Sequence, residues 1–302
     1  MTEKATPLVS IVIPTYNHAR FLGRALQSAM DQTYVNWEAI VIDNHSTDNT
    51  DEVMASFTDP RITYLKIHNK GVIAASRNAG INAAKGKWIA FLDSDDWWTK
   101  DKLQACFDCI NEHVDLVYHD LEIVNDKKRF FSRKNVKSWQ VKKPVLFDLL
   151  LNWSPITNSS VVVRKSLLVQ INGINENIDM VGTEDYNTWL RIAQLTDHFV
   201  YLQRKLGYYL IHNQSISQKD MTLSTRTAIA EFSHLLNEQQ KIKLEANIIY
   251  IKGCFNYLAN NHTIAKKDFR FVIICGYWML RIKSAVLLSM LISKRIFGIS
   301  LL

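Results

Sequence analysis

Cysteine is scarce in this sequence, and an apolar segment near the N-terminus is missing. Only four cysteines occur in 302 residues, too few for a disulfide framework in a chain of this length. No early stretch has the apolar centre of a signal peptide. With 47% hydrophobic and 22% charged residues, the composition excludes a disordered or collagen-like chain. We therefore expect one large domain, or a catalytic domain with a smaller appendage, in the reducing cytoplasm.

The sequence also lacks a run of about 20 apolar residues, the length that a membrane-spanning helix requires. The most apolar part is the C-terminal tail. Two ten-residue apolar segments there, Phe271–Leu280 and Ser284–Ser293, are separated by Arg281 and Lys283. Two short helices lying in a membrane interface fit this pattern. The alternative is a terminal pair of helices that packs against the protein core.

The net charge of +7 is concentrated in two segments. Residues 126–143 hold eight basic residues against one acidic residue, and residues 266–302 hold seven against one. A nucleic-acid-binding protein would more often spread its basic residues over its core surface. Two basic segments on an acidic body favour contact with an anionic membrane surface, and they argue against a nucleic-acid partner.

Several common cofactor and metal signatures are absent. No Gly-x-Gly-x-x-Gly sequence follows a predicted strand, which argues against a dinucleotide site of that type. Cys106 and Cys109 form one Cys-x-x-Cys pair, but Cys254 and Cys275 are isolated and no adjacent pair of histidines accompanies them. Because a structural zinc site needs four such ligands, we interpret Cys106 and Cys109 as helix-core residues.

The first half of the chain alternates apolar strands with helices. The expected strands are Leu8–Ile13, Trp37–Ile42, Ile62–Ile67, Trp88–Leu92 and Leu116–His119. The expected helices are Arg20–Met30, Thr47–Phe57, Val72–Ala84 and Thr99–Glu112. Such alternation predicts βαβ units, and hence an α/β fold with a Rossmann-like, mostly parallel sheet flanked by helices.

The second half is less regular. Residues 125–143 lack periodicity and predict a loop. They are followed by a predicted strand at Ser160–Val163, a helix at Asp185–Leu195, two apolar runs, Phe199–Leu202 and Tyr208–Ile211, and a helical segment over 222–260.

These patterns predict two regions. A catalytic domain would cover residues 1–215, with a nucleotide-binding half at 1–124 and an acceptor half at 144–215. A helical C-terminal region would cover 216–302, and its amphipathic tail, 266–302, would associate with a membrane.

Acidic residues gather where one predicted strand ends. Asp93, Asp95 and Asp96 lie within four residues, and their carboxylates repel one another unless a cation neutralises them. Mg²⁺ and Mn²⁺ bind a few carboxylates together with substrate phosphates, so a divalent metal is one interpretation. The alternative is a solvated helix N-terminus, where aspartate is favoured by capping and by the helix dipole.

Two further strand ends carry polar side chains. Pro14-Thr15-Tyr16-Asn17 closes the first predicted strand, and Asp43-Asn44 closes the second. In parallel sheets ligands bind outside the carboxyl ends of the strands, so these groups should face one crevice with Asp93. Asp43 or Asn44 would accept a hydrogen bond from a nucleobase, Asp93 would bind a ribose hydroxyl, and Arg77 would approach a diphosphate.

Five segments in order resemble one known family, the inverting glycosyltransferases of family 2, which have the GT-A fold. The segments are Val9–Asn17, Val41–Asp48, Ala75–Gly80, Phe91–Asp96 and Thr183–Asp185. The resemblance implies a nucleotide-sugar donor, usually UDP-linked, bound through Pro14 to Asn17, Asp43, Asn44, Arg77, Asp93 and Ser94. It also implies Mn²⁺ or Mg²⁺ as cofactor. Asp95 would bind the metal, Asp93 would lie near the ribose and the metal, and His212 would lie near the metal or the diphosphate.

The same resemblance makes Asp185 the catalytic base. In an inverting transfer an acceptor hydroxyl attacks the anomeric carbon while the nucleotide leaves from the opposite face, and a carboxylate must take the hydroxyl proton. Glu184 would orient Asp185 or bind acceptor hydroxyls. The alternative is that Glu184 and Asp185 only cap a helix. Trp97 would stack on the sugar or the acceptor, or would pack under the acidic loop together with Trp98.

One position departs from the family pattern: Asn44 stands where many relatives have a second acid, which weakens the inference of uracil over another base. The Gln-x-x-Arg-Trp signature of processive relatives is absent, so we expect the addition of a single sugar. The expected acceptor is a polyprenyl-diphosphate-linked saccharide of bacterial polysaccharide or O-antigen synthesis, at the inner face of the plasma membrane. The alternatives are a non-catalytic nucleotide-sugar-binding subunit and a metal-dependent nucleotidyltransferase.

Overall fold

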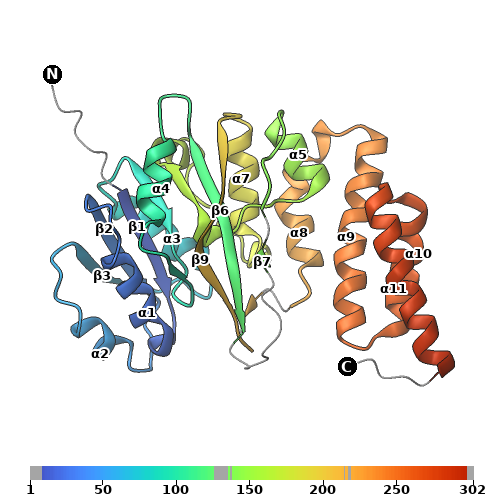
Figure 1. Ribbon diagram of the computed structural model, residues 1–302, viewed down its shortest axis with the longest axis horizontal. Coiled ribbons are helices and arrows are strands. Elements are labelled where there is room, and N and C mark those ends of the chain that lie inside the picture. Colours follow the sequence, from blue (N-terminus) through green and yellow to red (C-terminus); the bar gives the residue numbers. More distant parts are fainter. Residues whose placement is uncertain (1–8, 126–134, 137, 214, 217–218, 298–302) are drawn as a thin grey trace. The chain divides into compact units, whose positions relative to one another are not determined.

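The computed structural model of this chain describes residues 9–125, 135–136, 138–213, 215–216 and 219–297. Most of the predicted basic loop and the last five residues of the predicted tail therefore lie outside the described residues. The chain divides into two compact units, residues 1–149 with 154–212 and residues 150–153 with 213–302. The first unit contains the sheet, and the second is helical (Figure 1). The functions predicted for the two regions stay predictions.

The strands among the described residues form one nine-stranded sheet at the centre of the first unit. Its order is β3-β2-β1-β4-β8-β6-β9-β5, and β7 pairs with β6 beside this path. The strands are β1 (Val9–Thr15), β2 (Trp37–Asp43), β3 (Ile62–Lys66), β4 (Trp88–Phe91), β5 (Trp97–Trp98), β6 (Leu116–Asn125), β7 (Asn135–Val136), β8 (Val162–Arg164) and β9 (Phe199–Ile211).

Helices connect and flank the strands (Figure 1). In the first unit they are α1 (Ala19–Met30), α2 (Thr50–Ala55), α3 (Ile73–Ala83), α4 (Lys102–Cys109), α6 (Lys165–Gln170) and α7 (Glu184–Ala193), with the 3-10 helices η1 (Asn158–Ser160) and η2 (Ile178–Met180). Helix α5 (Val145–Asn152) ends in the second unit, which also contains α8 (Thr222–Ile229), the 3-10 helix η4 (Ala230–Leu235), α9 (Glu238–Leu258), α10 (His262–Cys275) and α11 (Trp278–Phe297).

The N-terminal half of the sheet agrees with the sequence prediction, whereas the C-terminal half is mixed. Strands β3, β2, β1 and β4 run parallel in adjacent positions. Strand β8 is antiparallel to both β4 and β6, and β5 is antiparallel to β9. The two predicted apolar runs after residue 198 form the single strand β9, parallel to β6, with register shifts at Asp120. Apolar runs reveal that a strand is buried, but they carry no information about its direction.

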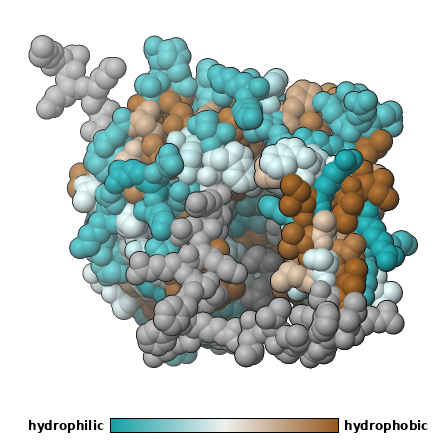
Figure 2. Space-filling view, turned by 45° about the vertical axis from the view of Figure 1, so that its right-hand side comes forward, coloured by the Kyte–Doolittle hydropathy of each residue, from teal (hydrophilic) through white to brown (hydrophobic). Residues whose placement is uncertain are grey.

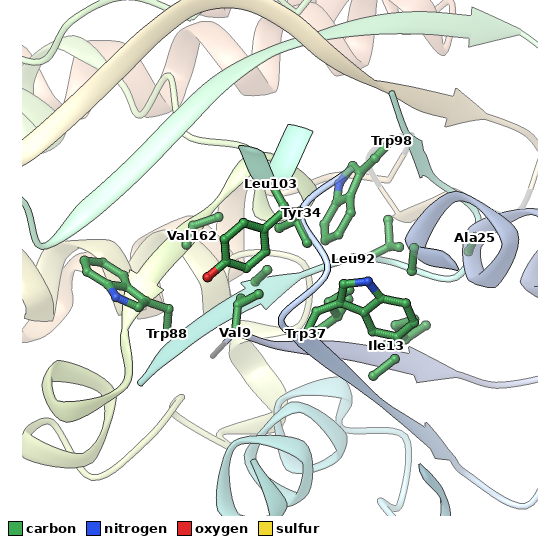
Figure 3. Close-up of a cluster of buried hydrophobic side chains, with 14 of the residues drawn as sticks. Val9, Ile13, Ala25, Tyr34, Trp37, Trp88, Leu92, Trp98, Leu103 and Val162 are labelled. Atoms are coloured by element: carbon green, nitrogen blue, oxygen red, sulfur yellow. The ribbon is translucent and has the colours of Figure 1, made fainter. Parts of the chain in front are cut away.

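The core between the sheet and its helices is rich in aromatic side chains. Trp37 and Trp88 lie beside the strand residues Val9 and Val162, and Tyr34 and Trp98 belong to the same cluster (Figure 3). These residues are at most 5% exposed. Such burial provides much of the free energy that stabilises a sheet with helices on its faces.

A glycine allows α3 to approach the sheet closely. A Cβ atom at Gly80 would lie 2.6 Å from Val12 Cγ1 and 2.7 Å from Ile42 Cδ1. Both distances are far shorter than van der Waals contact, so only glycine fits without displacing β1 or β2. The position of α3 in turn determines where Arg77, one turn earlier, directs its side chain.

The helical tail differs from its sequence prediction. The break falls at Gly276 and Tyr277, between α10 and α11, so that Arg281 and Lys283 lie inside α11. Arg281 donates hydrogen bonds to the carbonyl oxygens of Gly276 (2.7 Å) and Ile274 (2.6 Å). A cation at the C-terminus of a helix satisfies carbonyl groups that have no partner within the helix, which explains how a charged residue stabilises this turn. Among the described residues, no helix is long and apolar enough to cross a bilayer.

Candidate functional site

The ends of three neighbouring strands meet in the structure. Thr15, at the end of β1, pairs in register with Asp43, at the end of β2, and Val12 pairs with Phe91 of β4. The backbone N–H of Asn44 donates to the carbonyl oxygen of Thr15 at 3.1 Å. The segments after β1, β2 and β4 therefore leave the same edge of the sheet, which is where ligands bind in folds of this kind.

Two of these segments are joined by hydrogen bonds. The backbone N–H of Asn17 donates to Ser46 Oγ at 2.8 Å, and Asn17 Oδ1 accepts from the backbone N–H of Thr47 at 2.8 Å. Asn17 and His45 both have positive φ angles, 51° and 52°. Asparagine tolerates this left-handed conformation better than most residues, because its short polar side chain bonds locally. The loop after β1 therefore keeps a defined shape, with Tyr16 53% exposed at its tip.

Asp43 is completely buried and holds the loop that follows β2. Its carboxylate accepts hydrogen bonds from the N–H and Oγ of Ser46 and from the hydroxyl of Tyr64 (2.9 Å). Asn44 Oδ1 accepts from the backbone N–H of Asn69 at 2.9 Å. Both residues therefore shape the predicted nucleobase site, and their contacts with a base stay predictions.

The acidic loop after β4 is linked to the end of β9. His212 directly follows β9, is 4% exposed, and has its Nε2 3.0 Å from Asp95 Oδ2. His18 Nδ1 lies 2.8 Å from Ser94 Oγ, and its ring meets that of His212 edge-on. Burial lowers the pKa of His18, which favours its neutral imidazole. His212 was predicted from the sequence as a site residue, whereas His18 was not, although His18 directly follows Asn17.

Asp96 has a different role from its two acidic neighbours. It is 1% exposed, and its Oδ1 accepts the backbone N–H of Leu210 in β9 at 3.0 Å. Burial, reinforced by the charges of Asp95 and Asp93, raises the pKa of Asp96 well above its usual value. The third carboxylate of the acidic loop is thus buried and anchored to β9, and the carboxylates of Asp93 and Asp95 remain for a ligand.

Those two carboxylates suit a divalent metal that also binds phosphate. Asp95 and Asp93 have side chains 20% and 25% exposed, and His212 adds an imidazole beside Asp95. Among the described residues, no group of three or more His, Cys, Asp or Glu side chains is placed to hold a metal ion. Mg²⁺ and Mn²⁺ are commonly held by one or two carboxylates with substrate phosphates completing the shell, so this donor set fits.

Arg77 joins the acidic loop to the start of α7. Its side chain is 4% exposed, Nη2 lies 2.7 Å from Asp93 Oδ1, and Nη1 lies 2.5 Å from Glu184 Oε1. Asn158 Nδ2 also donates to Asp93 Oδ1, at 3.0 Å. Glu184 Oε2 accepts the backbone N–H of Gly182 at 2.6 Å. Arg77, Asp93 and Glu184 are thus joined by an ion-pair bridge, which the separate roles expected for them did not include, and those roles stay predictions.

Asp185 lies in the first turn of α7, partly buried beside this bridge. Burial and the adjacent Glu184 raise the pKa of Asp185 to about 7, while Arg77 opposes the rise. A carboxylate with a pKa near neutrality is well suited to accept a proton, because it is both ionised and basic at the working pH. Helix capping alone would stabilise the ionised form and give the opposite shift.

Trp97 and Trp98 make different contacts. Trp97 belongs to β5, its ring stacks on Tyr208 with centroids 4.8 Å apart, and the guanidinium of Arg24 lies 3.5 Å from its ring centroid. Trp98 is buried and donates from Nε1 to the carbonyl oxygen of Ser159 at 2.7 Å. Packing is the role that these contacts support for Trp98, and a contact of Trp97 with an acceptor stays a prediction.

A stacked pair of histidines lies beside the predicted nucleobase site and was not predicted from the sequence. The rings of His45 and His68 lie 3.8 Å apart and nearly parallel, beside Asn44 and Asn69. His45 lies within the Val41–Asp48 segment of the resemblance, but no role was expected for it, and His68 lies in none of the five segments.

Comparison with known proteins gives two kinds of match. Residues 10–168 match glycosyl transferase family 2. The Escherichia coli UDP-Glc:alpha-D-GlcNAc-diphosphoundecaprenol beta-1,3-glucosyltransferase WfgD is 32% identical over 188 residues, which are 62% of this chain and 70% of WfgD.

Two solved structures share the fold. The S. aureus TarS fragment 1–349 in complex with UDP-GlcNAc has a TM-score of 0.64 at 18% identity, covering 97% of this chain and 93% of that one. A mannosyltransferase from Pyrobaculum calidifontis, in complex with GDP-Man and Mn²⁺, has a TM-score of 0.62 at 16% identity, covering 98% and 89%. These likenesses confirm the predicted fold class.

Proposed function

The chain belongs to glycosyl transferase family 2, and we propose that it is an inverting enzyme that transfers one hexose from a UDP-sugar to a lipid-linked saccharide. The name of WfgD specifies a UDP-Glc donor and a GlcNAc-diphosphoundecaprenol acceptor, and TarS was solved with UDP-GlcNAc. Both names support a UDP-linked hexose, and the first supports a polyprenyl-diphosphate acceptor of bacterial polysaccharide or O-antigen synthesis.

One observation carries the proposal: the acidic loop and the first turn of α7 share the guanidinium of Arg77. A transferase must hold the phosphates of its donor and the base that deprotonates its acceptor close enough together for the reaction. In the proposed site Asp93 lies on the donor side, and Glu184, next to Asp185, lies on the acceptor side. The bridge supports both assignments together.

The donor would bind along the three strand ends. Pro14 to Asn17, Asp43 and Asn44 would surround the nucleoside, and Asp93 with Ser94 would bind the ribose. Among the described residues, the hydroxyl of Thr15 is buried without a hydrogen-bond partner, which leaves it available to a ligand at this edge.

Asp95, His212 and Asp93 would hold Mn²⁺ or Mg²⁺. When bound, the metal neutralises the charge that develops on the leaving diphosphate. The ion present in the mannosyltransferase complex supports this class of metal. The chain itself would keep the two open carboxylates oriented, through Arg77 on Asp93 and through His212 on Asp95.

Asp185 would take the proton from the attacking hydroxyl of the acceptor. The new bond forms between that oxygen and the anomeric carbon, and the bond between this carbon and the diphosphate oxygen breaks with its electron pair. Attack and departure on opposite faces invert the anomeric configuration. Glu184, held by Arg77 and Gly182, would keep Asp185 in place, and Trp97 would border the acceptor.

We further propose that α10 and α11 lie on an anionic membrane surface, at the cytoplasmic face of the plasma membrane. One side of α11 exposes a stripe of large apolar side chains, Trp278, Met279, Ile282, Val286 and Met290, at helical spacing opposite the buried Leu280, Ser284 and Leu291. Figure 2 shows hydrophobic side chains, in brown, exposed beside hydrophilic ones in the right-hand part of the view.

The charges of these helices match such a surface. In α10, the exposed side chains of Lys267 and Arg270 lie beside those of Phe271 and Ile274, and Asp268, the one acid of that helix, is buried. An apolar stripe inserts between lipids while basic residues bind anionic headgroups, which is the usual design of interfacial helices. A polyprenyl-linked acceptor would be reached at the same surface.

The test is a coupled assay for UDP release across a set of UDP-hexoses, with and without a synthetic polyprenyl-diphosphate sugar. We expect UDP release with one donor that depends on the acceptor and on Mn²⁺ or Mg²⁺. Release of pyrophosphate would instead indicate a nucleotidyltransferase. Tight donor binding without turnover, unchanged by Asp185→Asn, would indicate a non-catalytic subunit.

A further inference from the structure

The side chain of Arg77 is placed unlike a group that contacts a diphosphate. Arg77 lies in the middle of α3, and the residue is 3% exposed. Both terminal nitrogens are engaged by carboxylates, and Nε is buried without a hydrogen-bond partner among the described residues. A guanidinium that binds phosphate must present N–H groups to the ligand. In the structure the charge of Arg77 is instead paired inside the protein, with the carboxylates of Asp93 and Glu184.

The two carboxylates that Arg77 holds come from distant parts of the chain. Asp93 follows β4 and Glu184 begins α7, 107 residues along the chain from Arg77. Helix α3 is itself fixed against the segment that leads to α7: Asn78 donates from Nδ2 to the carbonyl oxygen of Ile174 and accepts the N–H of Ile174 on Oδ1, both at 2.8 Å. Arg77 therefore extends from a rigid base.

We propose that Arg77 is a positioning residue, which holds the donor-side carboxylate of Asp93 and the acceptor-side carboxylate of Glu184 on one guanidinium and makes no contact with the donor. This inference rests on the proposed function, in which Asp93 lies at the donor and Asp185 is the base. It replaces the expectation that Arg77 approaches the diphosphate.

The two carboxylates depend on Arg77 to different degrees. Asp93 is also held by Asn158 Nδ2 at 3.0 Å, and its backbone N–H donates to Ser159 Oγ at 3.1 Å. Glu184 is buried beside Asp185, and Arg77 supplies the positive charge in contact with it. Removing one partner of a buried ion pair leaves an uncompensated charge, so Glu184 would move or take up a proton. Asp93 would stay.

This asymmetry predicts which kinetic constant changes. Donor binding survives the loss of Arg77, because the donor side keeps its other contacts. The placement of Asp185 does not survive, because Glu184 precedes it in the same helical turn. A misplacement of about 1 Å at a reacting group costs roughly 100-fold in rate. The loss should therefore appear in kcat and not in nucleotide affinity.

The experiment compares Arg77→Met and Arg77→Lys with the wild type. Lysine keeps the charge but has one ammonium group where arginine has two separated nitrogens, so it cannot hold both carboxylates in the same geometry. We expect kcat to fall by about 100-fold or more in both variants, while the Kd for UDP with Mn²⁺, measured by calorimetry, stays within about threefold of wild type.

A matched control is the pair of Arg164 with Asp115. Arg164 Nε lies 2.8 Å from Asp115 Oδ1 with side chains 20% and 16% exposed, and Arg164 pairs in register with Trp88, at the end of β4 away from the acidic loop. Arg164→Met removes a partly buried arginine–aspartate pair of the same unit. It should leave kcat within about twofold.

A second readout does not require turnover. Glu184→Gln removes the charge that Arg77 compensates, so in the Arg77→Met background it should restore part of the lost thermal stability. In the wild-type background the same change should lower the melting temperature. Equal effects of Glu184→Gln in both backgrounds would contradict the bridge.

A rise of tenfold or more in the UDP Kd with little change in kcat would overturn the proposal and indicate that Arg77 contacts the diphosphate. If Arg77→Met does not fold, Arg77→Lys decides between these outcomes. A wild-type protein that releases no UDP with any donor and acceptor would contradict the proposed function instead. The UDP affinities and melting temperatures would still test the bridge.

Discussion

Nε2 of His212 and Oδ2 of Asp95 lie 3.0 Å apart although 117 residues separate them in the chain. The end of β9 thereby delivers an imidazole to the loop that follows β4. A carboxylate and an imidazole together can bind a divalent metal such as Mn²⁺, whereas an aspartate or a histidine alone does not indicate a metal site. Their contact favours the metal interpretation of the acidic loop over that of a solvated helix N-terminus.

Replacing His212 should weaken metal binding. We expect His212→Ala to raise the Kd for Mn²⁺ in the presence of UDP by roughly 10- to 100-fold, the range seen when groups that orient or hold a metal are removed. Calorimetry measures the change. His198→Ala is the control, because His198 also contacts an aspartate, Asp115, at 3.4 Å in the same unit. An equal effect of both changes would contradict a metal role for His212.

The pKa of Asp185 predicts how activity depends on pH. A base must be deprotonated to act, so kcat should fall as pH decreases through about 7, the raised pKa of this carboxyl. Asp185→Asn should lower kcat by roughly 10²- to 10⁴-fold and leave UDP affinity unchanged. The pH profile of kcat and calorimetry with UDP measure both effects. A profile flat from pH 5 to 8 would contradict Asp185 as base.

The raised pKa of Asp185 also predicts that stability decreases with rising pH, whereas kcat increases. The pKa of Asp185 is higher in the folded protein than its ordinary value near 4, so the folded state binds the proton more tightly and is most stabilised by it at low pH. As pH rises through about 7, Asp185 ionises and that stabilisation is lost. Asp185→Asn should therefore raise the melting temperature at pH 8 and change it less at pH 5.

Gly80 should tolerate no side chain. A Cβ atom there would press on Val12 and Ile42, and overpacking of this kind costs about 1–3 kcal/mol of unfolding free energy. Gly23, in the middle of α1, is the matched control, since the nearest atom to its added Cβ is 3.8 Å away. Gly23→Ala should be neutral or stabilising by up to about 1 kcal/mol. Urea denaturation measures both, and similar outcomes would contradict the close approach of α3.

The apolar stripe of α11 should determine membrane binding. Each large side chain that leaves water for lipid contributes about 1.5 kcal/mol or more, so the triple change Trp278→Ser, Ile282→Ser and Val286→Ser should lower vesicle binding by more than 100-fold. Sedimentation with phosphatidylglycerol-containing vesicles measures it. The control is a triple serine variant at three other exposed apolar residues, Val35, Val169 and Leu195. Unchanged sedimentation of the α11 variant would exclude this surface.

Long-range pairing limited what the sequence could reveal about the fold. The parallel direction of β1 to β4 could be predicted from apolar runs that alternate with helices, because parallel strands need helical connections, whereas their order in the sheet could not. Strand β9 was divided by the exposed residues Gln203, Arg204 and Lys205, near which its register with β6 shifts. The break at Gly276 was missed because arginine and lysine inside a tail suggest an interruption, whereas Arg281 here caps the preceding helix.

The candidate site could likewise be predicted only in part from the sequence. Residues that end strands, such as Asp43 and Asp93, could be placed at one edge because strand ends coincide in a parallel sheet. The ion-pair bridge through Arg77 could not be predicted, because contact between α3 and α7 depends on long-range packing that residue spacing in the sequence does not reveal. The sequence likewise could not separate Asp96 from Asp93 and Asp95, since only burial against β9 distinguishes them.

The anchoring of Asp96 has a consequence for the protein before any ligand arrives. Burial raises the pKa of Asp96 and so favours its protonated form, and Asp96, hydrogen-bonded to Leu210, adds less negative charge to the loop than the sequence suggests. Repulsion among the carboxylates of the loop is reduced accordingly. The loop is therefore expected to keep its shape in chelator and at low ionic strength, so that under the proposed function the metal and the nucleotide would bind a site that is formed before they arrive.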